Sequence, residues 1–229
     1  MTPLITIILS FMLILGTIIT LSSSHWLLAW TGLEINTFAI IPFMTRDNHP
    51  RAMEAALKYF LVQSTAAITL LFAAASSAWL SGQWEIQQMT HPMPLTIAVL
   101  ALTMKMGLAP LHSWLPEVLQ GLNFMTGLIL STWQKLAPLA LLIQIPNAPS
   151  FLYTTVGLLS ILMGGWGGLN QTQLRKILAY SSIAHLGWII LIIHYLPSLA
   201  FTTFLVYTVL TLPIFLAFHH LQAKNMNSL

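Results

Sequence analysis

The stretch Leu102–Glu117, LTMKMGLAPLHSWLPE, combines features that an ordinary apolar helix does not have. Lys105 lies inside a run of hydrophobic residues, and Pro110 and Pro116 follow it closely. Proline removes a backbone N–H donor and disfavours helix in the residue before it. The stretch therefore predicts a helix that is broken between Lys105 and Trp114.

The composition decides which solvent surrounds this lysine. Of the 229 residues, 57% are hydrophobic and only 6% are charged, whereas roughly 25% of the residues in a soluble domain are charged. Apolar runs recur along the whole chain and the connections between them are short, so no soluble domain is inserted. The sequence predicts an all-α fold, a polytopic transmembrane helical bundle that forms one domain over residues 1–229.

The length of the apolar runs predicts the number of membrane spans. A membrane helix needs about 20 apolar residues, which divides this chain into about eight spans with the break in the fourth. The N-terminal run has no basic segment before it and no small-residue cleavage site, so we expect a permanent span rather than a signal peptide. The expected spans are residues 4–21, 26–44, 55–79, 95–116, 124–144, 151–169, 177–194 and 199–221.

The loop cations predict an orientation. An even number of spans places both termini on one side of the membrane, and the links on that side carry all the loop cations. The positive-inside rule then assigns this side to the cytoplasm or the mitochondrial matrix. These cations are Arg46, Arg51, Arg175, Lys176 and Lys224.

Ionisable residues near the middle of the expected spans indicate function. Such a group costs at least about 2.5 to 3.5 kcal/mol on insertion scales and marks a functional site by default. Glu34, Lys105, Lys135 and His185 each lie near the centre of a span. In general, burial lowers the pKa of an amine and a nearby carboxylate raises it, so a change in either can switch the amine between holding and releasing a proton. We therefore predict a proton relay in which Glu34 is the charge partner of Lys105 and Lys135 follows.

These residues also have structural interpretations. Glu34 and Lys105 could form a static ion pair that only fixes helix packing, although a buried pair is a poor way to gain stability. Lys135 could extend its ammonium group toward the membrane surface. Lys58 follows Glu54 at the i, i+4 spacing of a helical salt bridge. For Lys58, this salt bridge and a place in the relay are therefore alternatives.

The helix break and His185 also have structural interpretations. A plain proline kink would explain Pro110 and Pro116, and His185 could be a packing histidine. In a membrane, however, freed backbone groups are tolerated only inside protein or beside water, and discontinuous helices recur at ion sites. Because the break coincides with Lys105 and His112, we favour a functional break and include His112 and His185 in the predicted relay.

Several classes of chemistry find no support in the sequence. The absence of cysteine excludes disulfides, thiolate-held iron–sulfur clusters and cysteine zinc sites in this chain, so redox chemistry is expected on a partner. The segment GGWGG at residues 164–168 is not a nucleotide-binding loop and is more consistent with close helix packing. No metal-ligand spacing and no basic patch for nucleic acid is present.

Five long motifs occur in a fixed order: HWLLAWTGLEINTFAIIP, EAALKYFLVQ, MKMGLAPLHSWLPEVLQG, TWQKLAPLALL and GGLNQTQLRKILAYSSIAHLGW. They resemble the chain 2 family of mitochondrial NADH:ubiquinone oxidoreductase (respiratory complex I), an antiporter-like membrane subunit, in its vertebrate-like form. The resemblance covers essentially the whole chain. It implies a proton-pumping, multi-pass subunit of the mitochondrial inner membrane, with both termini of this chain in the matrix.

The resemblance also implies roles for individual residues. Glu34 resembles the family's coupling glutamate, Lys105 the lysine of the broken helix, and Lys135 the next lysine along the axis. Lys58, His112 and His185 lie in motifs that match the family's and are included in the implied relay. The resemblance implies no cofactor in this chain, since NADH, FMN, iron–sulfur clusters and ubiquinone belong to partner subunits. The implied partners are the other membrane-arm subunits of complex I and the lipid bilayer.

The chain departs from this family in length. Mitochondrial members continue for several further helices, including a second broken helix with a lysine, so the sequence is expected to be shortened at its C-terminus, either as part of a longer chain or as a variant. Two alternatives to a proton-translocating subunit are a structural membrane-arm subunit, whose buried charges serve packing and assembly only, and a stand-alone antiporter.

Overall fold

The computed structural model describes residues 2–46, 49–145 and 149–222. Lys224 and parts of the links at residues 47–48 and 146–148 lie outside the described residues. The described part is helical and contains no strand, which confirms the predicted all-α fold. The helices are α1 (Pro3–Ser22), α2 (Trp26–Met44), α3 (Pro50–Ser81), α4 (Pro92–Met106), α5 (Trp114–Gly121), α6 (Phe124–Ser131), α7 (Trp133–Gln144), α8 (Ser150–Leu169), α9 (Leu174–Ile193) and α10 (Pro197–Leu221), with a 3-10 turn at Ile86–Gln88.

The membrane spans follow the prediction in position. Among the described residues, 7 helical segments are long and apolar enough to cross a membrane, with α6 and α7 together forming one of them. The remaining predicted span, the fourth, is the broken one, and its α4 has only 15 residues. The third predicted span, residues 55–79, lies within a longer helix. The helix α3 already begins at Pro50, because proline is favoured in the first turn and the His49 side chain accepts from the Arg51 N–H.

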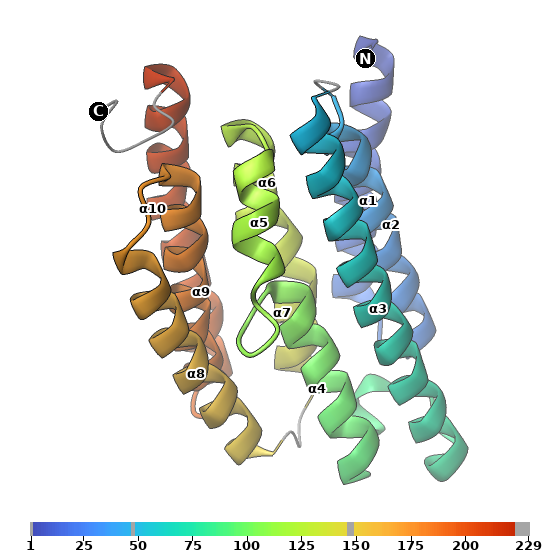
Figure 1. Cartoon of the computed structure of the whole chain (residues 1–229). Coiled ribbons are helices and arrows are strands. Elements are labelled where there is room, and N and C mark those ends of the chain that lie inside the picture. The colour runs from blue at the N-terminus through green and yellow to red at the C-terminus, as the bar shows by residue number, and fades with distance from the viewer. Residues whose placement is uncertain (1, 47–48, 146–148, 223–229) are drawn as a thin grey trace. The chain divides into compact units, whose positions relative to one another are not determined.

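The predicted break in the fourth span is present. The helix α4 ends at Met106, and α5 begins only at Trp114 (Figure 1). Gly107 has a φ of 78°, in the left-handed region that favours glycine, and a Cβ at this position would lie 3.2 Å from the Trp114 ring. The chain therefore leaves the helix one residue after Met106, before the first proline.

The fifth span has its predicted bounds but is not a continuous helix. It is interrupted at Thr132, between α6 and α7. The hydroxyls of Ser131 and Thr132 both donate to the Leu128 carbonyl, at 3.0 and 2.7 Å. Hydroxyl groups that bind backbone carbonyls of the preceding turn often bend a helix, although Ser182 makes the same kind of bond within the continuous α9.

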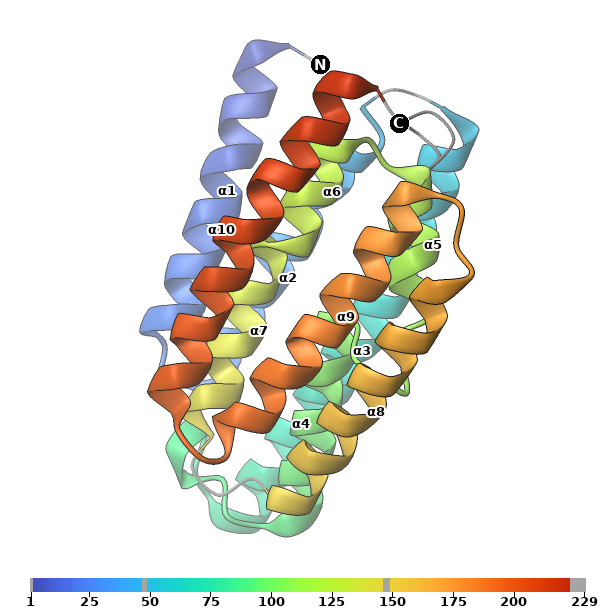
Figure 2. The same ribbon diagram turned by 90° about the vertical axis from the view of Figure 1, so that its left-hand side faces the viewer.

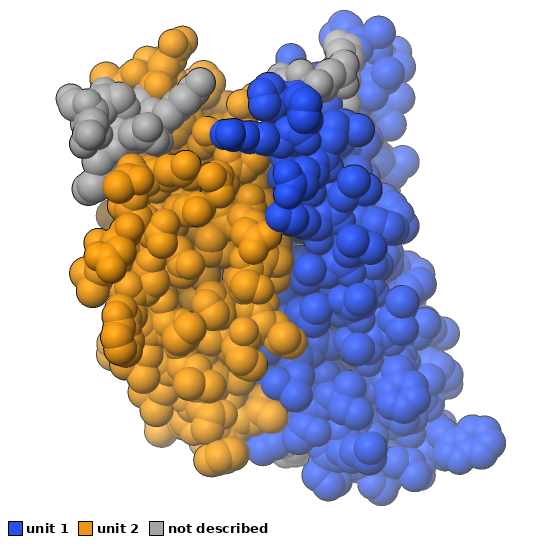
Figure 3. Space-filling model, viewed as in Figure 1, with its two compact units in different colours: residues 1–106, 134–149 blue, residues 107–133, 150–229 orange. Residues whose placement is uncertain are grey.

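The chain forms two compact units (Figure 3). Unit 1 comprises Met1–Met106 and Gln134–Pro149, and unit 2 comprises Gly107–Trp133 and Ser150–Leu229. The single domain expected over residues 1–229 stays a prediction, and part of it lies outside the described residues.

In unit 1, α2 packs against both α1 and α3, and α3 packs against α4. Figure 1 shows α1, α2 and α3 side by side. The helices α1 and α2 approach closely at Gly16 and Gly32, where a Cβ on either glycine would lie 2.8 Å from the other's carbonyl oxygen. The link between α3 and α4 pairs with the chain before α2, since the Trp26 N–H donates to the Trp84 carbonyl at 3.0 Å.

In unit 2, α8 and α9 pack along their length (Figure 2). A Cβ on Gly164 would lie 2.7 Å from the Ala184 nitrogen, and a Cβ on Gly167 would collide with the Tyr180 ring. These contacts confirm the predicted close packing at GGWGG, although Gly165 faces open space. At the start of α9, the Arg175 guanidinium donates to the Leu122 carbonyl and lies 5.6 Å from the centre of the Phe124 ring.

Candidate functional site

The buried charges of unit 1 centre on an ion pair between α2 and α4. The Lys105 Nζ lies 3.3 Å from the Glu34 Oε1, and the two side chains are 2% and 15% exposed. The structure thus contains the predicted pairing of these two residues. Because both charges are withdrawn from water, neither can lose its partner without leaving an uncompensated buried charge.

The backbone of Lys105 is held in an unusual way. In a continuous α-helix, its carbonyl would accept from the N–H of Ala109. Here the Lys105 carbonyl instead accepts from the Nε2 of Gln63 on α3, at 3.2 Å. The Ala109 N–H donates to the Ser160 hydroxyl on α8, at 2.9 Å. One hydrogen bond lies within unit 1 and the other within unit 2.

Lys135 lies near the beginning of α7 and is almost fully buried in unit 1. The adjacent Gln134 donates through its Nε2 to the Asn36 carbonyl on α2, at 3.3 Å. Asn36 follows Glu34 by two residues. The beginning of α7 is thus tied to the part of α2 that carries the paired carboxylate, and the three principal predicted residues all belong to unit 1.

Lys58 is placed differently. It lies on the exposed side of α3, with a side chain that is 43% exposed. Its Nζ pairs with the Glu54 Oε1 at 2.8 Å, at the i, i+4 spacing. This geometry favours the helical salt bridge that the spacing offers as an alternative, and a role for Lys58 in the relay stays a prediction.

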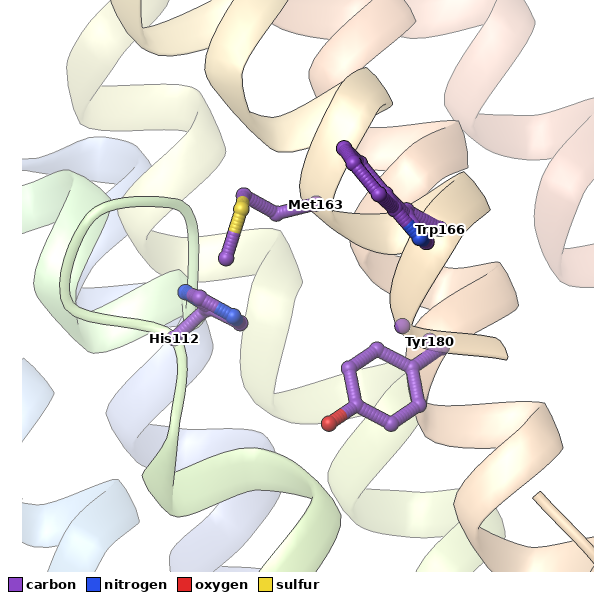
Figure 4. Close-up of a pocket in the computed structure, with 5 residues that line it drawn as sticks. His112, Met163, Trp166 and Tyr180 are labelled. Carbon is purple, nitrogen blue, oxygen red and sulfur yellow. The ribbon is translucent and has the colours of Figure 1, made fainter. Parts of the chain in front are cut away.

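The two histidines of the predicted relay belong to unit 2. His112 lies in the connection before α5, with its Nδ1 3.2 Å from the Pro110 carbonyl. It lines a pocket of about 260 Å³ (Figure 4). The lining side chains come from the connection, α8 and α9: His112, Met163, Trp166 and Tyr180, together with the backbone of Gly167.

His185 lies on an exposed face of α9, with its ring 5.6 Å from the Tyr207 ring. A packing histidine would make such a ring contact, so the contact favours the packing interpretation of His185. For both histidines, a part in proton transfer stays a prediction.

Sequence reasoning missed the side chains that satisfy backbone groups where helices stop. Gln63 and Ser160 serve the break in the fourth span. At the interruption of the fifth, the Tyr207 hydroxyl on α10 donates to the Ser131 carbonyl at 3.2 Å. A glutamine in the middle of an apolar span is a visible signal, whereas a serine in such a span is too common to stand out.

No group of His, Asp and Glu side chains is arranged to hold a metal ion within the part of the chain that the structure describes. The arrangement in unit 1 instead offers an amine and a carboxylate in contact, inside the membrane-spanning region and beside a helix end. Such a pair can exchange a proton or hold opposite charges.

Residues 23–229 match the family model described as "NADH:quinone oxidoreductase/Mrp antiporter, TM". The chain belongs to this family.

Members of this oxidoreductase and antiporter family include closely similar relatives. NADH-ubiquinone oxidoreductase chain 2 of Tetraodon nigroviridis is 63% identical over 230 residues, which cover 100% of this chain and 66% of the relative. The protein of the same name from Salmo salar is 60% identical, with the same coverage. The relatives are longer than this chain, as the resemblance implied, and the chain spans 66% of their length.

A solved structure supports the fold assignment. A chain of "Respiratory complex I from Thermus thermophilus with bound Aureothin" superimposes with a TM-score of 0.87 at 30% sequence identity. The match covers 94% of this chain and 51% of that one.

Proposed function

We propose that this chain is a proton-translocating membrane-arm subunit of NADH:ubiquinone oxidoreductase. The observation that carries the proposal is the buried pair of Glu34 and Lys105 at the end of a broken helix, in a chain of the oxidoreductase and antiporter family. An ionisable pair in the membrane interior is costly to retain, which favours a functional reason for it.

In the proposed mechanism, the amine and the carboxylate act as successive proton carriers. Lys105 holds a proton while its ammonium faces Glu34, and releases it when that contact is loosened, because a carboxylate at close range favours the charged amine. Lys135, also buried in unit 1, is the next acceptor. The proposed relay also includes Lys58, His112 and His185.

The subunit carries out no redox step in this proposal. NADH, FMN, iron–sulfur clusters and ubiquinone are bound by partner subunits, and the energy of their reaction drives the change at the ion pair from a distance. We place the subunit in the mitochondrial inner membrane, with both termini of this chain on the matrix side. The neighbouring membrane-arm subunits and lipid cover its exposed apolar helix faces.

The substitution Lys105→Met tests the proposal in the assembled enzyme. Proton pumping per assembled complex is expected to fall by about two orders of magnitude, the usual contribution of a proton-transfer group. Lys176→Met is the matched control, since Lys176 lies at the beginning of α9 in unit 2. Normal coupled turnover in the Lys105→Met enzyme would refute the relay.

The second candidate function is a structural subunit, which the direct 3.3 Å contact also favours. It predicts that Glu34→Gln and Lys105→Met act through assembly alone, seen as loss of the complex on native gels. Under that hypothesis, whatever complex assembles pumps at the normal rate. A stand-alone antiporter would instead be active in vesicles as a purified monomer.

A further inference from the structure

We propose that Gln63 and Ser160 are positioning residues that keep the fourth span broken at Lys105, each by taking one half of the backbone hydrogen bond that a continuous helix would form there. The effect that these two residues have on proton pumping rests on the proposed function. The hydrogen bonds themselves are properties of the fold.

The register of the break carries the inference. A helical carbonyl at position i accepts from the N–H at position i+4, so Lys105 and Ala109 are the partners that a continuous helix would join. These are the two groups that the Gln63 amide and the Ser160 hydroxyl bind, at 3.2 and 2.9 Å. The two side chains therefore replace one specific backbone bond, rather than filling space near the break.

Burial makes these side chains necessary. Gln63 is 3% exposed and Ser160 is 0% exposed, and the backbone groups that they bind belong to buried residues as well. Water cannot serve these groups from outside, and an unsatisfied amide or carbonyl inside a membrane protein is costly. Without the two side chains, the Lys105 carbonyl and the Ala109 N–H lose the partners that the structure gives them, and the end of α4 is no longer held by α3.

Ser160 does more than a serine in a helix usually does. Its hydroxyl donates to the Val156 carbonyl in its own helix at 2.7 Å, which is ordinary for serine. The same oxygen also accepts from the Ala109 N–H. This second bond joins α8 to the connection that follows the break.

The hydrogen bond from Gln63 has a direct consequence for the ion pair. It ties the last turn of α4 to α3 and so fixes the backbone of Lys105. With that anchor, the Nζ reaches the Glu34 carboxylate on α2. Without this hydrogen bond, the last turn of α4 loses its tie to α3, and the amine is no longer held at that position.

The test compares variants of the full chain in the assembled complex. Gln63→Met and Ser160→Ala each remove one hydrogen bond, and we expect proton pumping per complex to fall about five- to tenfold in each. The double variant is expected to be no slower than the slower single variant, since both bonds hold the same break. The matched controls are Gln144→Met and Ser181→Ala, because Gln144 lies at the end of α7 and the Ser181 hydroxyl binds only within its own helix.

An infrared measurement separates positioning from general stability. The carboxylate band of Glu34 is identified by its loss in the Glu34→Gln enzyme. It is expected to shift in Gln63→Met and to stay unchanged in Gln144→Met. Should Gln63→Met not assemble, Gln63→Asn, whose amide is too short to reach the carbonyl, takes its place in the same two measurements.

Two results would overturn the inference: variants at both positions that pump at the normal rate, or slowed pumping with an unmoved Glu34 band in the Gln63 variant. The pumping result counts against the inference where Lys105→Met abolishes pumping, whereas the infrared result does not depend on the outcome for Lys105→Met. If Lys105→Met pumps normally, the proposed function fails, while the infrared band still reports whether Gln63 positions the ion pair.

Discussion

The buried ion pair predicts an order of stability among three variants. Glu34→Gln leaves the Lys105 ammonium, 2% exposed, without its counter-charge, whereas Lys105→Met leaves the Glu34 carboxylate, which is 15% exposed. Breaking a buried pair from one side costs about 3 to 5 kcal/mol. Because the amine is the more deeply buried partner, Glu34→Gln should lie near the upper end of this range and Lys105→Met near the lower end.

The double variant Glu34→Gln with Lys105→Met completes the cycle. It removes both charges, and replacing a buried pair by uncharged residues of similar volume is often neutral. We therefore expect the double variant to be more stable than either single variant, although it should not pump. The double variant therefore distinguishes an effect on assembly from an effect on proton transfer, which neither single variant can do alone.

The assay is thermal inactivation of the assembled complex, followed as the intact fraction on native gels over a temperature series. Pumping is measured on the same samples and expressed per intact complex. The reasoning is refuted if Lys105→Met destabilises the complex more than Glu34→Gln, or if the double variant loses as much stability as the two single variants summed. The first result would contradict the burial argument, and the second would show that the two charges do not interact.

Three further predictions concern packing and surface contacts, each measured by the same thermal series. Gly164→Ala should destabilise the complex by about 1 to 3 kcal/mol, because the added Cβ would meet the α9 backbone. The control Gly165→Ala, with nothing within 4 Å of the added Cβ, should be neutral or stabilising, and equal effects of the two variants would contradict the close packing of α8 on α9. Tyr207→Phe should cost about 1 kcal/mol by leaving the Ser131 carbonyl without its donor, and an unchanged midpoint would show that another group takes the donor's place. Lys58→Met should change stability by less than about 1 kcal/mol, since its salt bridge is exposed, and a larger loss would point to a buried role.

Much of the fold follows from local features of the sequence. The apolar runs predict the spans because a membrane demands a minimum length of apolar helix. The break after Lys105 follows from its prolines and glycine, whose backbone preferences act within a few residues. The fifth span shows the limit of this reasoning, since serine and threonine occur in many unbroken helices and nothing local marks Thr132 as an interruption.

The sequence by itself determined the class of the protein, the position of its broken helix and which ionisable residues need an explanation, because hydropathy and backbone preference are local properties. The sequence also predicts the pairs of Glu34 with Lys105 and of Lys58 with Glu54, which the structure contains. Only the tertiary structure decided that Gln63 binds a carbonyl 42 positions away in the chain and that Ser160 binds the Ala109 N–H. Such contacts depend on which helix faces turn toward each other. Which faces meet depends on the packing of residues that are far apart in the sequence, so it cannot be predicted from any short segment.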